Sequence, residues 1–155
     1  MVKILLPPSE GKTPSTTGPT LDLDSLSAPE LTTKRKRVLS ALKKVSKRRG
    51  ALEKLGVGAS LAADVERNTV LDEIPCAPAL LTYSGVLFEA MGASELVAQS
   101  ENDERLRERL QDVHIFSALF GLVHGLDVIP AYRLAMKTDL GTVSYTHPDA
   151  ADERG

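Results

Sequence analysis

The order of apolar and polar residues along the chain predicts a mixed α/β fold of the α+β type. The apolar run at residues 2–6 stops at Pro7 and Pro8, which is typical of a buried strand. Apolar runs at 78–83 and 113–118 predict two more strands. Helical patterns lie between these runs, so the sequence favours one compact domain in which helices flank a central mixed sheet.

The strongest helical pattern covers residues 31–49. Its apolar residues recur every three or four positions and form one stripe: Leu31, Val38, Leu42 and Val45. Gly50 follows this segment, and glycine commonly ends a helix. The same reasoning predicts shorter helices at 51–55, 59–74, 86–92, 93–99 and 102–111.

Two segments lack a regular pattern. Residues 9–30 are rich in Ser, Thr, Pro and Gly, which predicts a long connection, and long connections in compact domains usually have a function. Residues 141–155 show no pattern of core residues. We therefore expect one domain over residues 1–140, followed by a tail over 141–155 that is poorly ordered or foreign to the domain.

Charge is distributed unevenly along the chain. Residues 34–54 contain ten basic residues and one acidic residue, a net charge of +9, whereas the rest of the chain carries −11. A concentrated positive segment on an acidic protein indicates a site for a polyanion such as DNA, bound through its phosphates without sequence preference. The alternative is a solvated helix face, which is what most charge runs are.

The motif Gly56-Val57-Gly58 lies directly after this basic segment. Together with Ala62 and Val65 it fits the turn and second helix of a helix-hairpin-helix, although the usual spacer before the first glycine is absent. Glycine permits close backbone approach, so amides of the turn could hold a phosphate with help from nearby cations: Lys47, Arg48, Arg49 and Lys54. The alternative is a structural corner between two helices, where glycine is also common.

Polar residues gather where the predicted strands end. The first strand is followed by Ser9, Glu10 and Lys12, the second ends in Tyr83 before Ser84 and Gly85, and Tyr132 and Arg133 follow a proline. The Gly-Lys-Thr triplet at 11–13 is not a Walker phosphate loop, because Leu6 stands where that pattern needs glycine. An alternative function is therefore an enzyme of unknown reaction with a polar cleft formed by four residues: Glu10, Lys12, Tyr83 and Arg133.

Several kinds of chemistry have no motif in this sequence. Cys76 is the single cysteine, which excludes a disulfide within the chain. No metal-binding spacing and no Gly-x-Ser-x-Gly elbow occurs, so we assign no metal, no cofactor and no catalytic residue. No apolar run is long enough to cross a bilayer, and the N-terminal one is too short for a signal peptide. We expect a cytoplasmic protein with no membrane partner.

Three segments together resemble one known family. They are "ILLPPSEGKT", "LTYSGVLFEAM" and "FSALFGLVHGLDVIPAYRLAM", in the order found in the YaaA family of peroxide stress proteins, also designated DUF328 or UPF0246. The resemblance implies a cytosolic protein of the peroxide response that limits unincorporated iron and protects DNA. It also implies a single α/β unit with a helix-hairpin-helix and a positively charged cleft linked to DNA binding.

The resemblance further implies which residues form that cleft. The matching positions are Ser9, Glu10, Lys12, Tyr83, Gly85, Ser117, Gly121, Asp127, Tyr132 and Arg133. This chain departs from the family at His124-Gly125, where an Arg-Pro pair is usual, so one positive charge is absent. Family members usually run considerably longer, so the chain looks truncated at its C-terminus, and we expect it to expose apolar surface.

Overall fold

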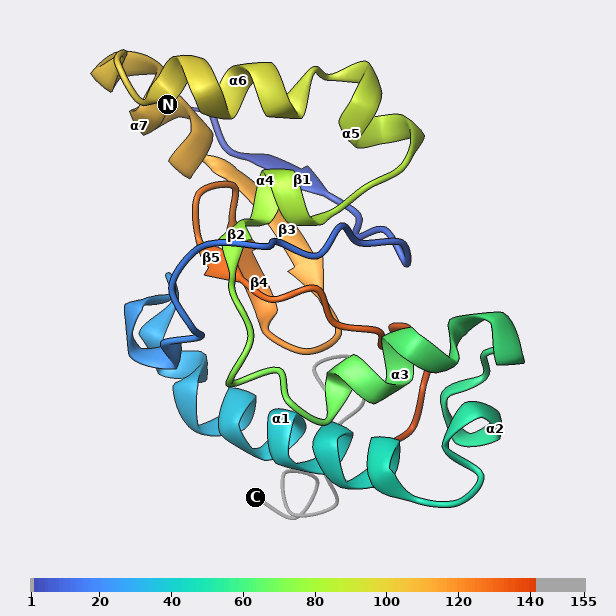
Figure 1. Cartoon of the computed structure of the whole chain (residues 1–155). Coiled ribbons are helices and arrows are strands. Elements are labelled where there is room, and N and C mark those ends of the chain that lie inside the picture. The colour runs from blue at the N-terminus through green and yellow to red at the C-terminus, as the bar shows by residue number, and fades with distance from the viewer. Residues whose placement is uncertain (1, 142–155) are drawn as a thin grey trace.

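The computed structural model describes residues 2–141, in which β-structure lies between two groups of helices (Figure 1). The elements follow the order β1 (Ile4–Leu6), α1 (Thr32–Lys47), α2 (Ala51–Leu55), α3 (Ala62–Asn68), β2 (Ala77–Pro78), α4 (Ala79–Thr82), α5 (Val86–Ala90), α6 (Ala93–Ser100), α7 (Glu104–Gln111), β3 (Val113–Ser117), β4 (Gly121–His124) and β5 (Val128–Ile129). Short 3₁₀ turns precede α1 at Leu23–Ser25 and Pro29–Leu31, and another precedes α3 at Ala59–Leu61. The tail expected at 141–155 lies, apart from Gly141, outside the described residues.

The main sheet is mixed, as the sequence predicts. β1 runs parallel to β3, with Ile4 opposite Val113, and β4 runs antiparallel to β3 in the order β1-β3-β4. A second, two-stranded ladder joins β2 and β5. The turn from β3 to β4 is closed by Ser117, whose hydroxyl accepts a hydrogen bond of 2.9 Å from the Phe120 amide. The sequence correctly predicts β3, whereas β4 and β5 are additional strands.

The expectation of a buried first strand is wrong. Ile4 and Leu5 of β1 are 48% and 60% exposed, and Phe116 on the neighbouring strand is 43% exposed. β1 is present at the predicted place as an edge strand that pairs only with β3 in the described part of the chain, and of its three residues only Leu6 packs against the core. The apolar surface that the sequence led us to expect is therefore present on this sheet.

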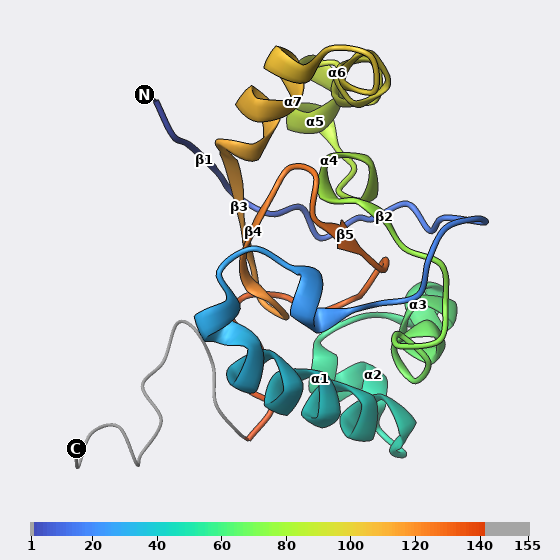
Figure 2. The same ribbon diagram turned by 90° about the vertical axis from the view of Figure 1, so that its left-hand side faces the viewer.

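Helix α1 follows the apolar stripe of the sequence. Val38, Leu42 and Val45 are buried in the core together with Leu39. The helix packs against α2 and α3, and these three helices lie at one end of the molecule while α5, α6 and α7 lie at the other (Figures 1 and 2). Within residues 2–141, no helix combines the length and apolar character needed to cross a membrane.

Two other expectations about secondary structure are corrected. The apolar run at 78–83, predicted as a strand, contains only the end of β2 and then the short helix α4. No residue of the run is exposed, and Ala79, Leu80 and Thr82 are buried, so the run has no solvent-facing side and periodicity cannot separate strand from helix. The helix expected at 59–74 is shorter: a 3₁₀ turn covers Ala59–Leu61, α3 ends at Asn68, and the backbone then continues in turns in which the amides of Thr69, Val70 and Glu73 bond carbonyls three residues earlier.

Candidate functional site

The loop that follows β1 is held against the end of α4. Lys12 lies opposite Tyr83 in an antiparallel bridge, and the Ser84 amide donates a 3.1 Å hydrogen bond to the Gly11 carbonyl. The Ser9 hydroxyl donates to the same carbonyl at 2.7 Å and shapes the loop from within. The structure thus brings together two polar segments that are about seventy positions apart in the sequence, as their places at predicted strand ends led us to expect.

Gly85 continues this contact into α5. Its φ of +115° is a backbone conformation that residues other than glycine rarely adopt. Gly85 lies beside the side chain of Ser9. The chain therefore turns sharply enough for Phe88 to stack on the Tyr83 ring, with 5.6 Å between the ring centroids. Ser9 and Gly85 consequently position the loop and the ring.

The amine of Lys12 packs against two aromatic rings. Its Nζ lies 4.2 Å from the ring centroid of Tyr132 and 5.4 Å from that of Tyr83, and it donates a 3.2 Å hydrogen bond to the Glu10 carbonyl. Burial lowers the pKa of Lys12 to about 7, and the positive charge of Arg133 acts in the same direction. The ring faces oppose this effect because they stabilise an ammonium ion. Lys12 is thus the described lysine best placed to exist partly as a neutral amine at pH 7.

The two tyrosines are locked together beneath this amine. Their hydroxyl groups are 2.7 Å apart, and the Ser117 hydroxyl lies 2.9 Å from that of Tyr132. Burial raises the pKa of Tyr83 to about 12 and that of Tyr132 well above its usual range. Both phenols therefore stay protonated at neutral pH and serve as a rigid floor for Lys12.

Arg133 is fixed by helix α3. Its guanidinium donates a 2.8 Å hydrogen bond to Asp64, which Arg67 also contacts at 3.3 Å. Burial alone would raise the pKa of Asp64, but the hydrogen bond from Arg133 and the charge of Arg67 bring it below its ordinary value. Asn68, one turn further along α3, bonds the backbone of Arg133. Sequence reasoning missed Asp64 and Asn68, whose spacing of four on a predicted helix was the available signal.

A cavity of about 640 Å³ lies between two members of this polar cluster, Glu10 and Arg133, and the bend at 56–58. Residues from three parts of the chain line it: Glu10; Lys54, Leu55, Gly56, Val57, Gly58 and Leu61; and Arg133, Leu134, Ala135, Lys137, Thr138 and Asp139. The two features that the sequence singled out separately therefore open onto one cavity. Its volume is within the range of small-molecule sites.

The hairpin only partly matches the expected phosphate-binding geometry. Gly56, with φ +69°, ends α2, and its amide donates to the Glu53 carbonyl at 3.1 Å. The Val57 amide donates to the Leu52 carbonyl at 2.9 Å, so neither amide is available to an anion. The expectation that the whole bend presents its amides is wrong for these two residues. Gly58 is exposed, and its amide has no acceptor among the described residues.

The basic residues of the sequence run occupy different environments. Lys36, Arg37, Lys44 and Arg48 line a hollow of about 450 Å³ on α1, together with Ser40, Ala41, Val45 and Leu140. Lys47 belongs to a neighbouring hollow that also contains Asp72, and Arg49 is exposed. Arg35 differs, because it is fully buried and donates hydrogen bonds of 2.8 Å to the carbonyls of Ser27, Phe120 and Leu122.

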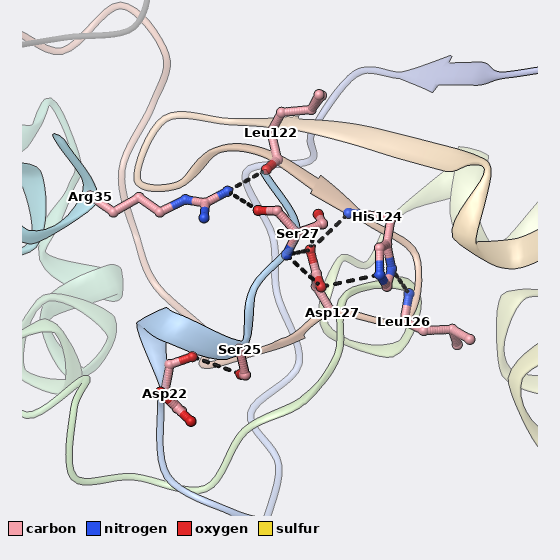
Figure 3. A network of polar contacts seen from close by, with 8 residues as sticks. All are labelled: Asp22, Ser25, Ser27, Arg35, Leu122, His124, Leu126 and Asp127. Atoms are coloured by element: carbon pink, nitrogen blue, oxygen red, sulfur yellow. Dashed lines mark hydrogen bonds and ion pairs between the residues drawn. The ribbon is translucent and has the colours of Figure 1, made fainter. Parts of the chain in front are cut away.

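Asp127 makes its contacts in a separate network, shown with Arg35 in Figure 3. Its carboxylate accepts hydrogen bonds from the Ser27 amide at 3.1 Å and from the His124 amide at 3.0 Å. Its backbone carbonyl accepts from Ala79 at 2.7 Å. These contacts tie the long N-terminal connection to the β4–β5 turn. The residues inferred from the resemblance therefore do not form one cleft. Asp127 holds the fold together at a place apart from the cluster around Lys12.

Within residues 2–141, the structure contains no group of three or more His, Cys, Asp or Glu side chains that could hold a metal ion. Cys76 is buried, and burial raises the pKa of its thiol to about 11. No donor set in the described part of the chain thus supports a metal or a thiolate, and the polar cluster around Lys12 is the candidate site.

Comparison with known proteins gives a consistent result. Residues 2–149 match the family described as "Peroxide stress protein YaaA". A UPF0246 protein of Corynebacterium efficiens is 43% identical over 145 residues, which cover 94% of this chain and 55% of that protein. A UPF0246 protein of Streptomyces coelicolor is 37% identical over 139 residues, covering 88% and 52%. The chain spans about half the length of the curated relatives it matches. It belongs to the YaaA family of peroxide stress proteins.

Proposed function

We propose that this chain contributes a DNA-binding surface to a cytoplasmic peroxide-stress response, and that α1 carries most of it. The supporting observation is the hollow on α1, which four cations line: Lys36, Arg37, Lys44 and Arg48. No acidic side chain among residues 2–141 lines this hollow. A group of cations that form no ion pair among residues 2–141 suits the phosphate backbone, which supplies most of the affinity in non-specific DNA binding.

The hairpin extends this surface beyond the end of α1. Lys47, Arg48 and Arg49 are exposed where α1 ends, and Lys54 follows on α2. The exposed Gly58 amide adds one donor for a phosphate oxygen. A phosphate at this point would lie beside the cavity that the hairpin shares with Glu10 and Arg133. In this proposal the cations attract the DNA backbone, and the Gly58 amide helps to orient one of its phosphates.

Binding of this kind has a clear experimental signature. We would measure the affinity of the chain for duplex, gapped and branched DNA by fluorescence anisotropy over a series of salt concentrations. The double variant Lys44→Ala/Arg48→Ala removes two cations from the α1 hollow. We expect weaker binding to every DNA, and a slope of log affinity against log salt that is smaller by about 2.

The matched control is Arg105→Ala/Arg109→Ala. These two residues are exposed on α7, at the other end of the molecule, and the change in net charge is the same. The control should reduce affinity much less than the α1 variant. Equal losses in both variants, or no binding of the unaltered chain to any of the DNAs, would overturn the proposal.

We also include in this proposal that the protein limits unincorporated iron, and the support is the family's peroxide-stress description.

A second candidate function is an enzyme, which a different observation favours. The Lys12 amine lies against Tyr132 and within the electrostatic influence of Glu10 and Arg133, and these last two residues both line the shared cavity. Amines in such surroundings are frequent in reactive sites.

A further inference from the structure

We propose that Lys12 forms an imine with an aldehyde, and that the aldehyde is the open-chain sugar of an abasic site in DNA. The substrate class rests on the proposed DNA binding. The imine chemistry itself rests only on the surroundings of Lys12, so the two parts can be tested separately.

Lys12 is not placed as a structural lysine usually is. A buried lysine normally pairs with a carboxylate or extends its amine into water. Among the described residues, Lys12 forms no ion pair within 4.0 Å, and its amine bonds only the Glu10 carbonyl while it packs on the Tyr132 and Tyr83 rings. The amine is thus oriented without having its charge neutralised.

The surroundings also favour the reactive form of the amine. Only an unprotonated amine attacks a carbonyl carbon, and desolvation beside another cation is a recognised way to obtain one. Burial and the charge of Arg133 bring the pKa of Lys12 to about 7, so a substantial share of the amine is neutral at pH 7. An ordinary lysine has less than about one thousandth of its amine neutral at that pH.

The shared cavity does not have Lys12 among its described lining residues, but it extends to Glu10, whose carbonyl the Lys12 amine bonds. Lys12 is partly exposed, and two of the three residues whose charges act on it, Glu10 and Arg133, line the cavity, whereas the third, Asp64, does not. The hairpin and Lys54 line the same space. A DNA backbone held there would bring one nucleotide next to the polar cluster, and an abasic nucleotide has no base to obstruct its entry.

The reaction is balanced without any further reagent. The neutral Nζ of Lys12 donates its electron pair to the aldehyde carbon, C1′ of the open sugar, and the π pair of the carbonyl moves to oxygen. Proton transfer from nitrogen to that oxygen gives a carbinolamine, which loses water and leaves a C=N bond to Lys12. The exposed carboxylate of Glu10, on the cavity wall, is placed to exchange the protons.

The test is to trap the imine by reduction. The 155-residue chain is incubated with a duplex that contains one abasic site, sodium borohydride is added, and the covalent product is located by peptide mass spectrometry. We expect cross-linking at Lys12, at least a tenfold loss in Lys12→Arg, and no loss in Lys3→Arg, a matched change of an exposed lysine. A duplex with the ring-closed tetrahydrofuran analogue, which has no aldehyde, should give no product.

Further measurements separate the two parts of the proposal. Lys12→Arg keeps the positive charge, so its circular dichroism and affinity for undamaged DNA show whether fold and binding survive, and peptide mapping of the unaltered chain needs no variant. A DNA-free arm uses pyridoxal 5′-phosphate and borohydride at pH 7. Labelling of Lys12 in that arm without any DNA binding would overturn the abasic substrate and retain the imine. DNA binding with cross-links spread evenly over the lysines, or undiminished in Lys12→Arg, would overturn the imine.

Discussion

Asn68 and Arg133 exchange two hydrogen bonds of 2.9 Å across 65 positions of sequence. The Asn68 amide group donates to the Arg133 carbonyl, and its oxygen accepts from the Arg133 amide. The side chain thereby bonds the backbone of Arg133 as a neighbouring strand would, and no strand pairs with this residue within 2–141. Asp64, one turn earlier on α3, holds the guanidinium of the same arginine. Helix α3 thus determines where one wall of the shared cavity stands.

The first prediction concerns this pair. Asn68 is fully buried, so Asn68→Ala leaves the amide and carbonyl of Arg133 without their partner. We expect the free energy of unfolding to fall by about 2 kcal/mol in urea denaturation. Asn102→Ala, at an exposed position after α6, is the control and should change it little. A loss no greater than that of the control would show that the exchange contributes nothing.

The second prediction separates the two glycines of the hairpin. Gly56 has φ +69°, so Gly56→Ala should destabilise the chain by about 1–2 kcal/mol through backbone strain alone. Gly58 has φ −85°, and an added Cβ there would meet nothing within 4 Å, so Gly58→Ala should be tolerated. Thermal unfolding of both variants checks the difference. Equal destabilisation would mean that Gly58 is needed for the fold as well.

The third prediction is a pH dependence due to Lys12. Its pKa in the folded chain, about 7, is below the ordinary lysine value of 10.5, so between these values the unfolded chain binds the additional proton. The contribution of Lys12 to stability should therefore increase as pH rises from about 7 to 10.5, by at most about 1.4 kcal/mol per pH unit.

This dependence is measured as the difference in unfolding free energy between the unaltered chain and Lys12→Met. Because all other groups titrate in both proteins, they cancel to first order. We expect the difference to move in favour of the unaltered chain as the solution becomes more alkaline. A difference that is constant over this range would mean that the amine titrates as an ordinary lysine.

Local pattern was sufficient for elements that have one buried face. The stripe containing Val38 and Leu42 predicted α1 to within two residues at either end, and the apolar run at 113–118 predicted β3. Pattern failed at 78–83, because side chains buried on all sides show no period, and at β1, because an apolar run does not reveal whether anything covers it. Pattern also missed the end of α3 at Asn68, where helical bonding changes to three-residue turns.

The candidate site likewise has some features that the sequence predicts and others that only the tertiary structure reveals. Its residue types were visible in the sequence, and so was the bend at 56–58, because glycine bends and polar residues after strands are local features. The separation of Asp127 and Arg35 from the surface, the capping bonds of Gly56 and Val57, and the meeting of Glu10, Arg133 and Gly58 at one cavity were decided by tertiary packing. Local sequence determines which backbone shapes and charges are available. Packing alone determines which of them lose water or face one another, and desolvation and proximity are what lower the pKa of Lys12.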